Sequence, residues 1–168
     1  VGEHTIVSMG LSSGLYPKPE KGVVLCDLDG TLANIDHRLH HVQGEKKDWK
    51  SFFSEIPNDG VNENVLDMLM QYEGAGNHVF LMSARPDDYR SQTEAWLERI
   101  FKGYKPHKAL FMRRHGDMRP DTEVKKGMFD SMFSKVPVEA VIDDRPSVIR
   151  MWREHGLNVI DVGKGVEF

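Results

Sequence analysis

The chain has 168 residues, 39% of them apolar, and a formal net charge of −4, which fits one globular domain and excludes a polyanion binder that uses its whole surface. No apolar run approaches the ~18–20 residues of a membrane helix, and the N-terminus lacks the features of a secretory signal. The single cysteine, Cys26, excludes an internal disulfide and a cysteine zinc cluster, so we expect a cytoplasmic protein with no membrane partner.

Regular patterns begin after residue 20. Residues 1–20 hold glycine, serine and proline with little periodicity and predict an N-terminal tail or linker; residues 21–168 then predict one domain. Short apolar runs predict strands, and apolar residues at helical spacing predict helices. In chain order we expect a strand at 22–26, a small helical insert at about 34–57, a helix at 62–72, a strand at 78–82, a helix at 86–101, a strand at 109–112, a helix at 121–133, a strand at 138–142, a helix at 146–155 and a strand at 158–162.

This alternation of strands and helices indicates the fold class. The strands are apolar on both faces, which is typical of a parallel sheet covered by helices on both sides. We therefore predict an α/β fold with a doubly wound, Rossmann-like sheet of five parallel strands and a small helical cap insert. In such sheets the reactive groups lie just beyond the carboxyl ends of the strands.

Polar side chains follow four of the predicted strands. Alone, each has a plain structural explanation, because aspartate and serine at strand ends commonly form turns or helix caps. Together they would place several carboxylates at one sheet edge, where a cation must neutralise them. Oxygen ligands of this kind suit Mg²⁺. The strand-end residues are Asp27, Asp29, Gly30 and Thr31, then Ser83 and Arg85, then Arg113 and Arg114, then Asp143, Asp144 and Arg145.

Two carboxylates one residue apart also suit phosphate chemistry. An aspartate can attack phosphorus and form an aspartyl-phosphate, while a second carboxyl protonates the leaving oxygen and later activates water. Asp27 and Asp29 could divide these two roles, with Gly30 permitting the tight turn that brings them together.

The sequence resembles a known family. The run Asp-Leu-Asp-Gly-Thr-Leu at 27–32 is similar to the first motif of the haloacid dehalogenase superfamily of phosphatases, and Ser83, Lys125 and Asp143/Asp144 match the later motifs in order. Residues 81–85, 113–125, 142–145 and 151–153 more closely resemble the phosphatase domain of phage polynucleotide kinase/3′-phosphatases. Those domains remove 3′-phosphates from nucleic-acid ends.

This resemblance implies a role for each matched residue. Asp27 would be the nucleophile and Asp29 the general acid and base. Ser83, Arg85, Arg113, Asp121, Lys125 and Arg145 would bind the substrate or its phosphate. Asp27, Asp29, Asp143 and Asp144 would hold Mg²⁺, and we prefer Asp144 to Asp143 as a direct ligand and Lys125 to Lys126 as the phosphate-binding lysine.

We therefore expect a Mg²⁺-dependent phosphomonoesterase that forms an aspartyl-phosphate and removes 3′-phosphates from nucleic-acid ends or nucleotides. A 5′-(deoxy)nucleotidase or a general small-molecule phosphatase remains an alternative. So does a non-catalytic module that binds nucleic-acid ends, although the intact Asp27/Asp29 pair argues against it. The sequence contains no Gly-x-x-x-x-Gly-Lys-Ser/Thr loop, so we expect no kinase activity from it.

Two further patterns concern the borders of the site. Between Arg99 and Lys126 nine lysines and arginines stand against three acidic residues, a net charge of +6 that predicts a solvated face or the border of a phosphate site. In the insert, the His-x-x-His spacing could bind a metal, but we favour a polar face or base-stacking surface for the three histidines. We favour a small core over a base platform for the aromatic residues, although exposed aromatics there could stack on a base. These residues are His37, His40, His41, Trp49, Phe52 and Phe53.

Overall fold

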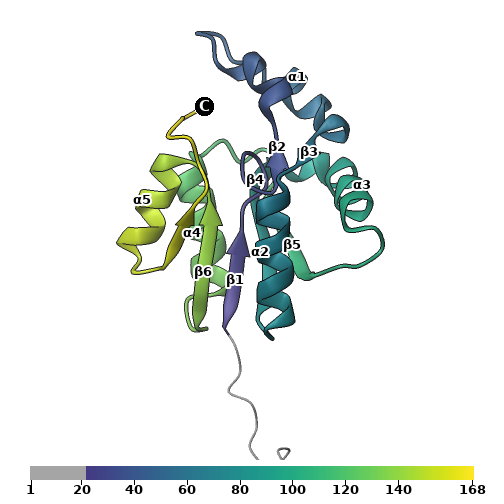
Figure 1. Cartoon of the computed structure of the whole chain (residues 1–168). Coiled ribbons are helices and arrows are strands. Elements are labelled where there is room, and N and C mark those ends of the chain that lie inside the picture. The colour runs from purple at the N-terminus through teal and green to yellow at the C-terminus, as the bar shows by residue number, and fades with distance from the viewer. Residues whose placement is uncertain (1–21) are drawn as a thin grey trace, which may run out of the picture.

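One parallel sheet of five strands organises the domain. A computed structural model describes residues 22–168, so the predicted tail at 1–20 lies outside the described residues. The strand order is β5-β4-β1-β6-β7 and every pairing is parallel (Figure 1), which confirms the predicted fold class. The strands are β1 (Val23–Cys26), β4 (His78–Pro86), β5 (His107–Arg113), β6 (Val138–Asp143) and β7 (Val159–Asp161).

Strand β1 lies at the centre of the sheet and is buried along its whole length. Its residues alternate between the two faces: Val24 and Cys26 pack into one hydrophobic cluster, and Val23 and Leu25 into the other. A strand that is apolar on both sides can be stable only where helices cover both faces, as they do here.

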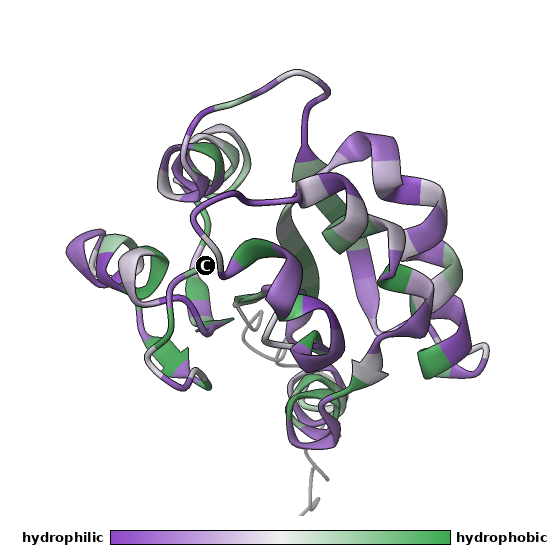
Figure 2. Ribbon diagram, turned by 90° about the horizontal axis from the view of Figure 1, so that it is seen from above, coloured by the Kyte–Doolittle hydropathy of each residue, from purple (hydrophilic) through white to green (hydrophobic). Residues whose placement is uncertain are grey.

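Helices supply the two outer layers. Trp96 and Leu97 of α3 and Leu69 of α2 pack in the cluster of Val24, whereas Phe129 of α4 and Trp152 of α5 pack in the cluster of Leu25. Seen from above, the helices lie on both sides of the sheet (Figure 2). Their bounds are α2 Glu63–Gly74, α3 Arg90–Phe101, α4 Asp121–Met132 and α5 Pro146–Glu154. No helix within residues 22–168 is long and apolar enough to cross a membrane.

The insert is built differently from the helical segment that the sequence predicts. Two 3₁₀ segments, η1 (Asp36–Val42) and η2 (Ile56–Asn58), flank one short helix, α1 (Trp49–Ser54). Strands β2 (Ala33–Asn34) and β3 (Gly60–Val61) pair antiparallel where the insert begins and ends. Strands of two residues are too short to show periodicity, which is why the sequence does not reveal them. Figure 1 shows α1 above the carboxyl edge of the sheet.

One predicted helix start is wrong. Pro86 does not open a helix but ends β4, where it pairs with Arg113 of β5. Its ψ of 141° is extended, and a proline also favours an extended conformation for the residue before it. Strand β4 therefore continues past Met82, and a 3₁₀ turn, η3 (Asp87–Tyr89), separates it from α3. The extra residues carry Ser83 and Arg85 to the carboxyl edge of the sheet.

Candidate active site

Three buried carboxylates meet at the carboxyl ends of the two central strands. Asp27 follows β1 directly, Asp143 is the last residue of β6, and Asp144 follows it. Each offers an oxygen that lies within 4.8 Å of the others, and all three side chains are buried. The parallel pairing of β1 with β6 creates this cluster, because Cys26 and Ile142 are register partners.

The turn after β1 fits closely against Asp144. Gly30 has a φ of +80°, and a Cβ at this position would lie 2.1 Å from Asp144 Oδ2, so only glycine leaves room for the carboxylate. The hydroxyl oxygen of Thr31 lies 3.1 Å from Asp27 Oδ2 and 3.1 Å from Asp144 Oδ1, and it donates to these carboxylates. From the other side, a Cβ at Gly163 would meet the Asp144 carbonyl oxygen at 2.0 Å.

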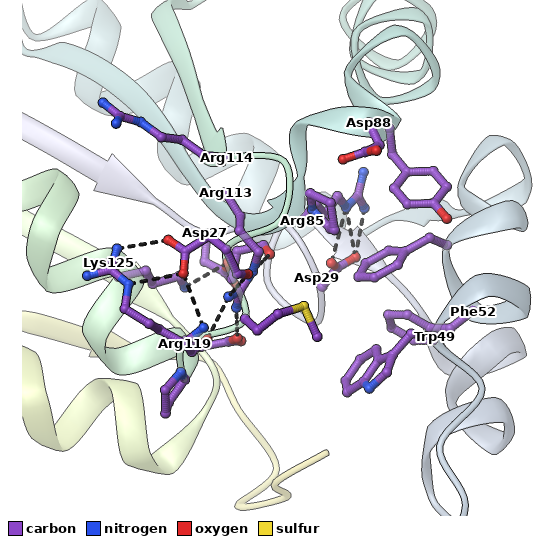
Figure 3. A pocket seen from close by; sticks show the side chains of 18 of the residues that line it. Asp27, Asp29, Trp49, Phe52, Arg85, Asp88, Arg113, Arg114, Arg119 and Lys125 are labelled. Carbon is purple, nitrogen blue, oxygen red and sulfur yellow. Dashed lines mark hydrogen bonds and ion pairs between the residues drawn. The ribbon is translucent and has the colours of Figure 1, made fainter.

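Lys125 is the cation that contacts this cluster. Its ammonium donates to Asp27 Oδ1 at 2.9 Å and to Asp143 Oδ2 at 2.8 Å (Figure 3). Burial lowers the pKa of Lys125, but the carboxylates of Asp143 and Asp27 raise it by more. The net result is a pKa above the usual lysine range. Lys125 therefore stays charged. Lys126 is exposed, so the structure favours Lys125 as the lysine of the site.

Asp143 is held by several groups at once. Besides Lys125, Trp152 Nε1 donates to its Oδ2 at 3.2 Å and the Asp144 backbone N–H donates to its Oδ1 at 2.9 Å. Asp144 has fewer partners among the described residues, with only the Thr31 hydroxyl donating to its side chain. Asp144 therefore has fewer competing contacts than Asp143, and its role as the direct metal ligand stays a prediction.

The cluster carries more negative than positive charge. Three carboxylates face one ammonium, and burial, followed by the charge of Asp143, raises the pKa of Asp144 to about 6. Burial is also the largest cause of the raised pKa of Asp27; Lys125 opposes it, while the two other carboxylates add to it. A divalent cation would neutralise this excess, and an all-oxygen donor set suits Mg²⁺. The residues present therefore fit the metal that we predict.

Asp29 lies in a separate, cationic environment. Its carboxylate accepts from Arg85 Nη2 at 2.7 Å and Nε at 3.1 Å, and from Arg38 Nη2. Burial raises the pKa of Asp29, but the two guanidinium groups outweigh it and hold the pKa well below the usual aspartate range. Asp29 is not one of the three clustered carboxylates. Its side chain lies in the same pocket as Asp27 but receives no support as a metal ligand.

Arg38 and Asp59 support the site without lining the pocket, and the sequence does not reveal them. Both side chains have no exposed surface, and Arg38 donates to Asp59 through Nε and Nη2, each at 2.7 Å. Arg85 Nη2 also donates to Asp59, at 3.2 Å. Two arginines and two aspartates thus form one buried network that joins the insert to β4 and to the loop after β1. No local pattern marks Arg38 or Asp59, because the partners lie 9 to 56 residues apart in the sequence.

Of the remaining predicted residues, three line the pocket and one, Ser83, is buried and does not line it. Asp121 bridges two arginines, accepting from Arg113 Nη2 and Arg145 Nη1 at 2.6 Å each, and all three line the pocket. Ser83 is fully buried, and its hydroxyl accepts from the Arg85 backbone N–H at 3.1 Å. Ser83 therefore supports the strand end at Arg85, and its role in binding phosphate stays a prediction.

Most of the residues predicted at the strand ends line a pocket of about 590 Å³ (Figure 3), whereas Ser83 does not. Asp27, Asp29 and Lys125 lie on it, as do Trp49 and Phe52 of the insert. The basic stretch divides between the site and the surface. Arg113, Arg114, Arg119 and Lys125 line the pocket, while Lys102, Lys105 and Lys108 are exposed and do not. Two of the three histidines of the insert pair with carboxylates, His37 with Asp59 and His41 with Glu55.

Comparison with known proteins identifies the family. The sequence model of the polynucleotide kinase PNKP phosphatase domain matches residues 21–167. The chain belongs to this family. It is thus a phosphatase domain of the haloacid dehalogenase type, as the residues at the strand ends predict.

Individual relatives agree with this assignment. A protein of Autographa californica nuclear polyhedrosis virus named "Putative bifunctional polynucleotide kinase/RNA ligase" is 32% identical over 135 residues, which are 78% of this chain and 18% of that protein. A chain in the structure of a Pnkp1/Rnl/Hen1 complex is 31% identical with a TM-score of 0.71, covering 86% of this chain and 47% of that one. This phosphatase domain therefore spans less than half the length of these relatives.

A more distant structure shows the fold alone. A haloacid dehalogenase-like hydrolase from Streptococcus pneumoniae has a TM-score of 0.59 at 10% identity, covering 83% of each chain. The sheet with its helical layers is thus shared well beyond the family.

Proposed function

We propose that this phosphatase domain is a Mg²⁺-dependent phosphomonoesterase that removes 3′-phosphates from nucleic-acid ends or nucleotides through an aspartyl-phosphate. The arrangement of Asp27 carries the proposal. Its carboxylate lies in the pocket beside a charged lysine and two further carboxylates, while the neighbouring Asp29 lies in the same pocket among guanidinium groups. This separation gives the two aspartates different charge environments, so the two carboxyl groups can take different roles.

In the first step, an oxygen of Asp27 attacks phosphorus and the bond from phosphorus to the 3′-oxygen breaks. The leaving oxygen takes a proton from Asp29, so the products are an aspartyl-phosphate and a free 3′-hydroxyl. Without substrate, Arg85 and Arg38 hold the pKa of Asp29 below its usual range and favour its ionised form. A phosphate anion beside it raises its pKa by repulsion between like charges, which favours the protonated form that this step needs.

In the second step, Asp29 acts as a base. It takes a proton from water, and the resulting hydroxide attacks phosphorus and breaks the bond to Asp27. Inorganic phosphate leaves and Asp27 regains its carboxylate. Arg85 and Arg38 stabilise Asp29 in its ionised form, which suits this step.

The metal would be held by the three clustered carboxylates, Asp27, Asp143 and Asp144. Lys125 compensates part of their negative charge through its ion pairs with Asp27 and Asp143. When bound, Mg²⁺ supplies positive charge that offsets the repulsion between the attacking carboxylate and the phosphate. Lys125 orients Asp27 through Oδ1, which leaves Oδ2 to the Thr31 hydroxyl.

The substrate class rests on the family and on the charge of the pocket. Family members are phosphatase domains of polynucleotide kinases, and Arg114, Arg119 and Lys50 give the pocket a cationic border. The relatives' names, which include an RNA ligase and an RNA repair complex, favour RNA ends among the possible substrates.

A panel of phosphate esters tests the substrate. We expect the 3′-phosphorylated oligonucleotide to have a higher kcat/KM than the 5′-phosphorylated one, in both RNA and DNA form. The measurement is release of inorganic phosphate at fixed ionic strength, because electrostatic attraction favours any anion at low salt. Equal or faster hydrolysis of the 5′-phosphate would instead support a nucleotidase. Binding of the 3′-end without turnover would support the non-catalytic module.

Removal of the metal should abolish activity. We expect no turnover in excess EDTA and recovery when Mg²⁺ is returned, because Asp27, Asp143 and Asp144 otherwise repel the phosphate. Mg²⁺ should also raise the melting temperature of the protein by neutralising the cluster. Full activity in EDTA, with metal shown to be absent by elemental analysis, would contradict this prediction.

A further inference from the structure

We propose that Trp49 stacks on the base of the terminal nucleotide and makes the enzyme prefer substrates that carry a base next to the 3′-phosphate. This inference rests on the proposed function and names the part of the substrate that the insert contacts. For Trp49 it favours the base platform over the small core that we expect for the aromatic residues of the insert.

The three aromatic side chains of α1 differ in exposure. Phe52 and Phe53 are buried, with 1% and 9% of their surface exposed, and they form the core of the insert as the sequence predicts. Trp49 is 40% exposed although it packs on both of them. Trp49 is therefore the member of this aromatic group with the most ring surface accessible to a ligand.

The packing of Trp49 fixes the ring in one orientation. Its ring lies nearly parallel to that of Phe53, at 5.9 Å between centroids and 22° between planes, and meets Phe52 edge-on at 5.6 Å. The cation of Arg38 lies 4.2 Å from the centroid of Phe52, so this aromatic group rests on the same buried network that holds Asp29. The ring of Trp49 is therefore a rigid platform, and such a platform loses little conformational entropy when a base stacks on it.

The platform lies where the nucleoside would be. Trp49 lines the same pocket as Asp27 and Asp29. Figure 3 shows Trp49 and Phe52 on the side of Asp29, opposite Lys125. In the proposed mechanism Asp29 contacts the leaving 3′-oxygen, so the sugar and base extend to this side of the pocket.

The charges nearby complement a nucleotide chain. Lys50, next to Trp49, and Arg114 on the opposite loop are exposed, line the pocket and form no ion pair with any residue from 22 to 168. Met118, which is 90% exposed, lines the pocket from the same loop as Arg114 and adds an apolar contact. An aromatic platform beside unpaired cations is the combination that binds single-stranded nucleic acid.

Two matched substrates test the proposal. One is a 3′-phosphorylated oligonucleotide, and the other has the same length and charge but lacks the terminal base. Because a base stacked on an aromatic residue is bound several-fold more tightly, we expect Trp49→Ala to lower the preference for the base-bearing substrate, measured as a ratio of kcat/KM values, by about 5- to 100-fold. Trp49→Phe should restore most of it.

The control is Tyr104→Ala. Tyr104 is 52% exposed but does not line the pocket, so its removal should leave the ratio at the value of the unmodified protein. If Trp49→Ala reduces kcat/KM for both substrates equally, the residue supports the insert and does not contact a base. If the ratio does not change, the proposal is wrong.

Fluorescence gives a readout that does not require turnover. Trp96 and Trp152 are buried, so Trp49 is the exposed member of the three tryptophans in the chain. The 3′-phosphorylated dinucleotide should quench its emission when it is added to Asp27→Asn protein, and its abasic counterpart should not. Quenching by both, or by neither, would overturn the proposal. The comparison of 3′- and 5′-phosphorylated oligonucleotides alone decides whether the 3′-phosphate is the substrate. The proposed function and the proposed role of Trp49 can therefore fail separately.

Discussion

Asp27→Asn is expected to reduce turnover of a 3′-phosphorylated oligonucleotide by roughly 10⁴-fold or more, because the amide is nearly the same size but cannot attack phosphorus. Lys125 retains Asp143 as a partner, so we expect the protein to keep its fold. The measurements are phosphate release and, in unmodified protein quenched with acid, recovery of a phosphorylated peptide that contains Asp27.

A control with the same chemical change separates the role of this residue from a loss of negative charge. Asp130 lies exposed on α4 and does not line the pocket, so Asp130→Asn should leave both activity and melting temperature unchanged. Near-normal hydrolysis by the Asp27→Asn protein would exclude a covalent intermediate on this residue.

Asp29→Asn should separate the two chemical steps. A ribose 3′-oxygen is a poor leaving group, so without a general acid we expect its release to slow by about 10²- to 10⁴-fold. Nitrophenyl phosphate is the comparison substrate. Its leaving group, nitrophenolate, departs without a proton, so the first step should stay fast with this substrate. Because the base for the second step is also missing, the variant should release one nitrophenolate per molecule in a rapid burst and accumulate the aspartyl-phosphate.

Asp59→Asn is the matched control for this experiment. It removes an anion from the same arginines, but Asp59 lies outside the pocket. Both variants should unfold more easily, since each leaves a buried guanidinium short of one charged partner. Only Asp29→Asn should show the burst. A burst in both variants, or equal losses for the two leaving groups, would contradict the assigned role of Asp29.

The sequence reveals the sheet because burial leaves a local pattern. Val23–Cys26 is buried on both faces, and such a run of apolar residues can be recognised without knowing its neighbours. The strand ends then place Asp27, Asp143 and Asp144 at one edge, because parallel strands share their direction. This part of the site follows from topology alone.

The surroundings of Asp29 could not be predicted in the same way. Arg38 is fully buried although an arginine is usually exposed, and its burial depends on Asp59, which follows η2 at the far end of the insert. The pairing is a property of the folded chain, and neither residue has a distinctive neighbour in the sequence. The spacing of Asp29 from Asp27 is visible in the sequence, but its arginine partners are not, and its role as a metal ligand stays a prediction.

Asp59 also determines how the insert can move. Its carboxylate accepts from Arg38 and Arg85, and its backbone carbonyl accepts from Trp96 Nε1 of α3 at 2.8 Å. Swinging the insert away from the sheet would separate these buried charges, which costs several kcal/mol. The insert is therefore a fixed wall, and the enzyme does not shield the phosphoryl group from bulk water by closing over it. With the 3′-phosphorylated substrate that we propose, that shielding would fall to the substrate itself, whose sugar and base would fill the open side of the pocket during the reaction.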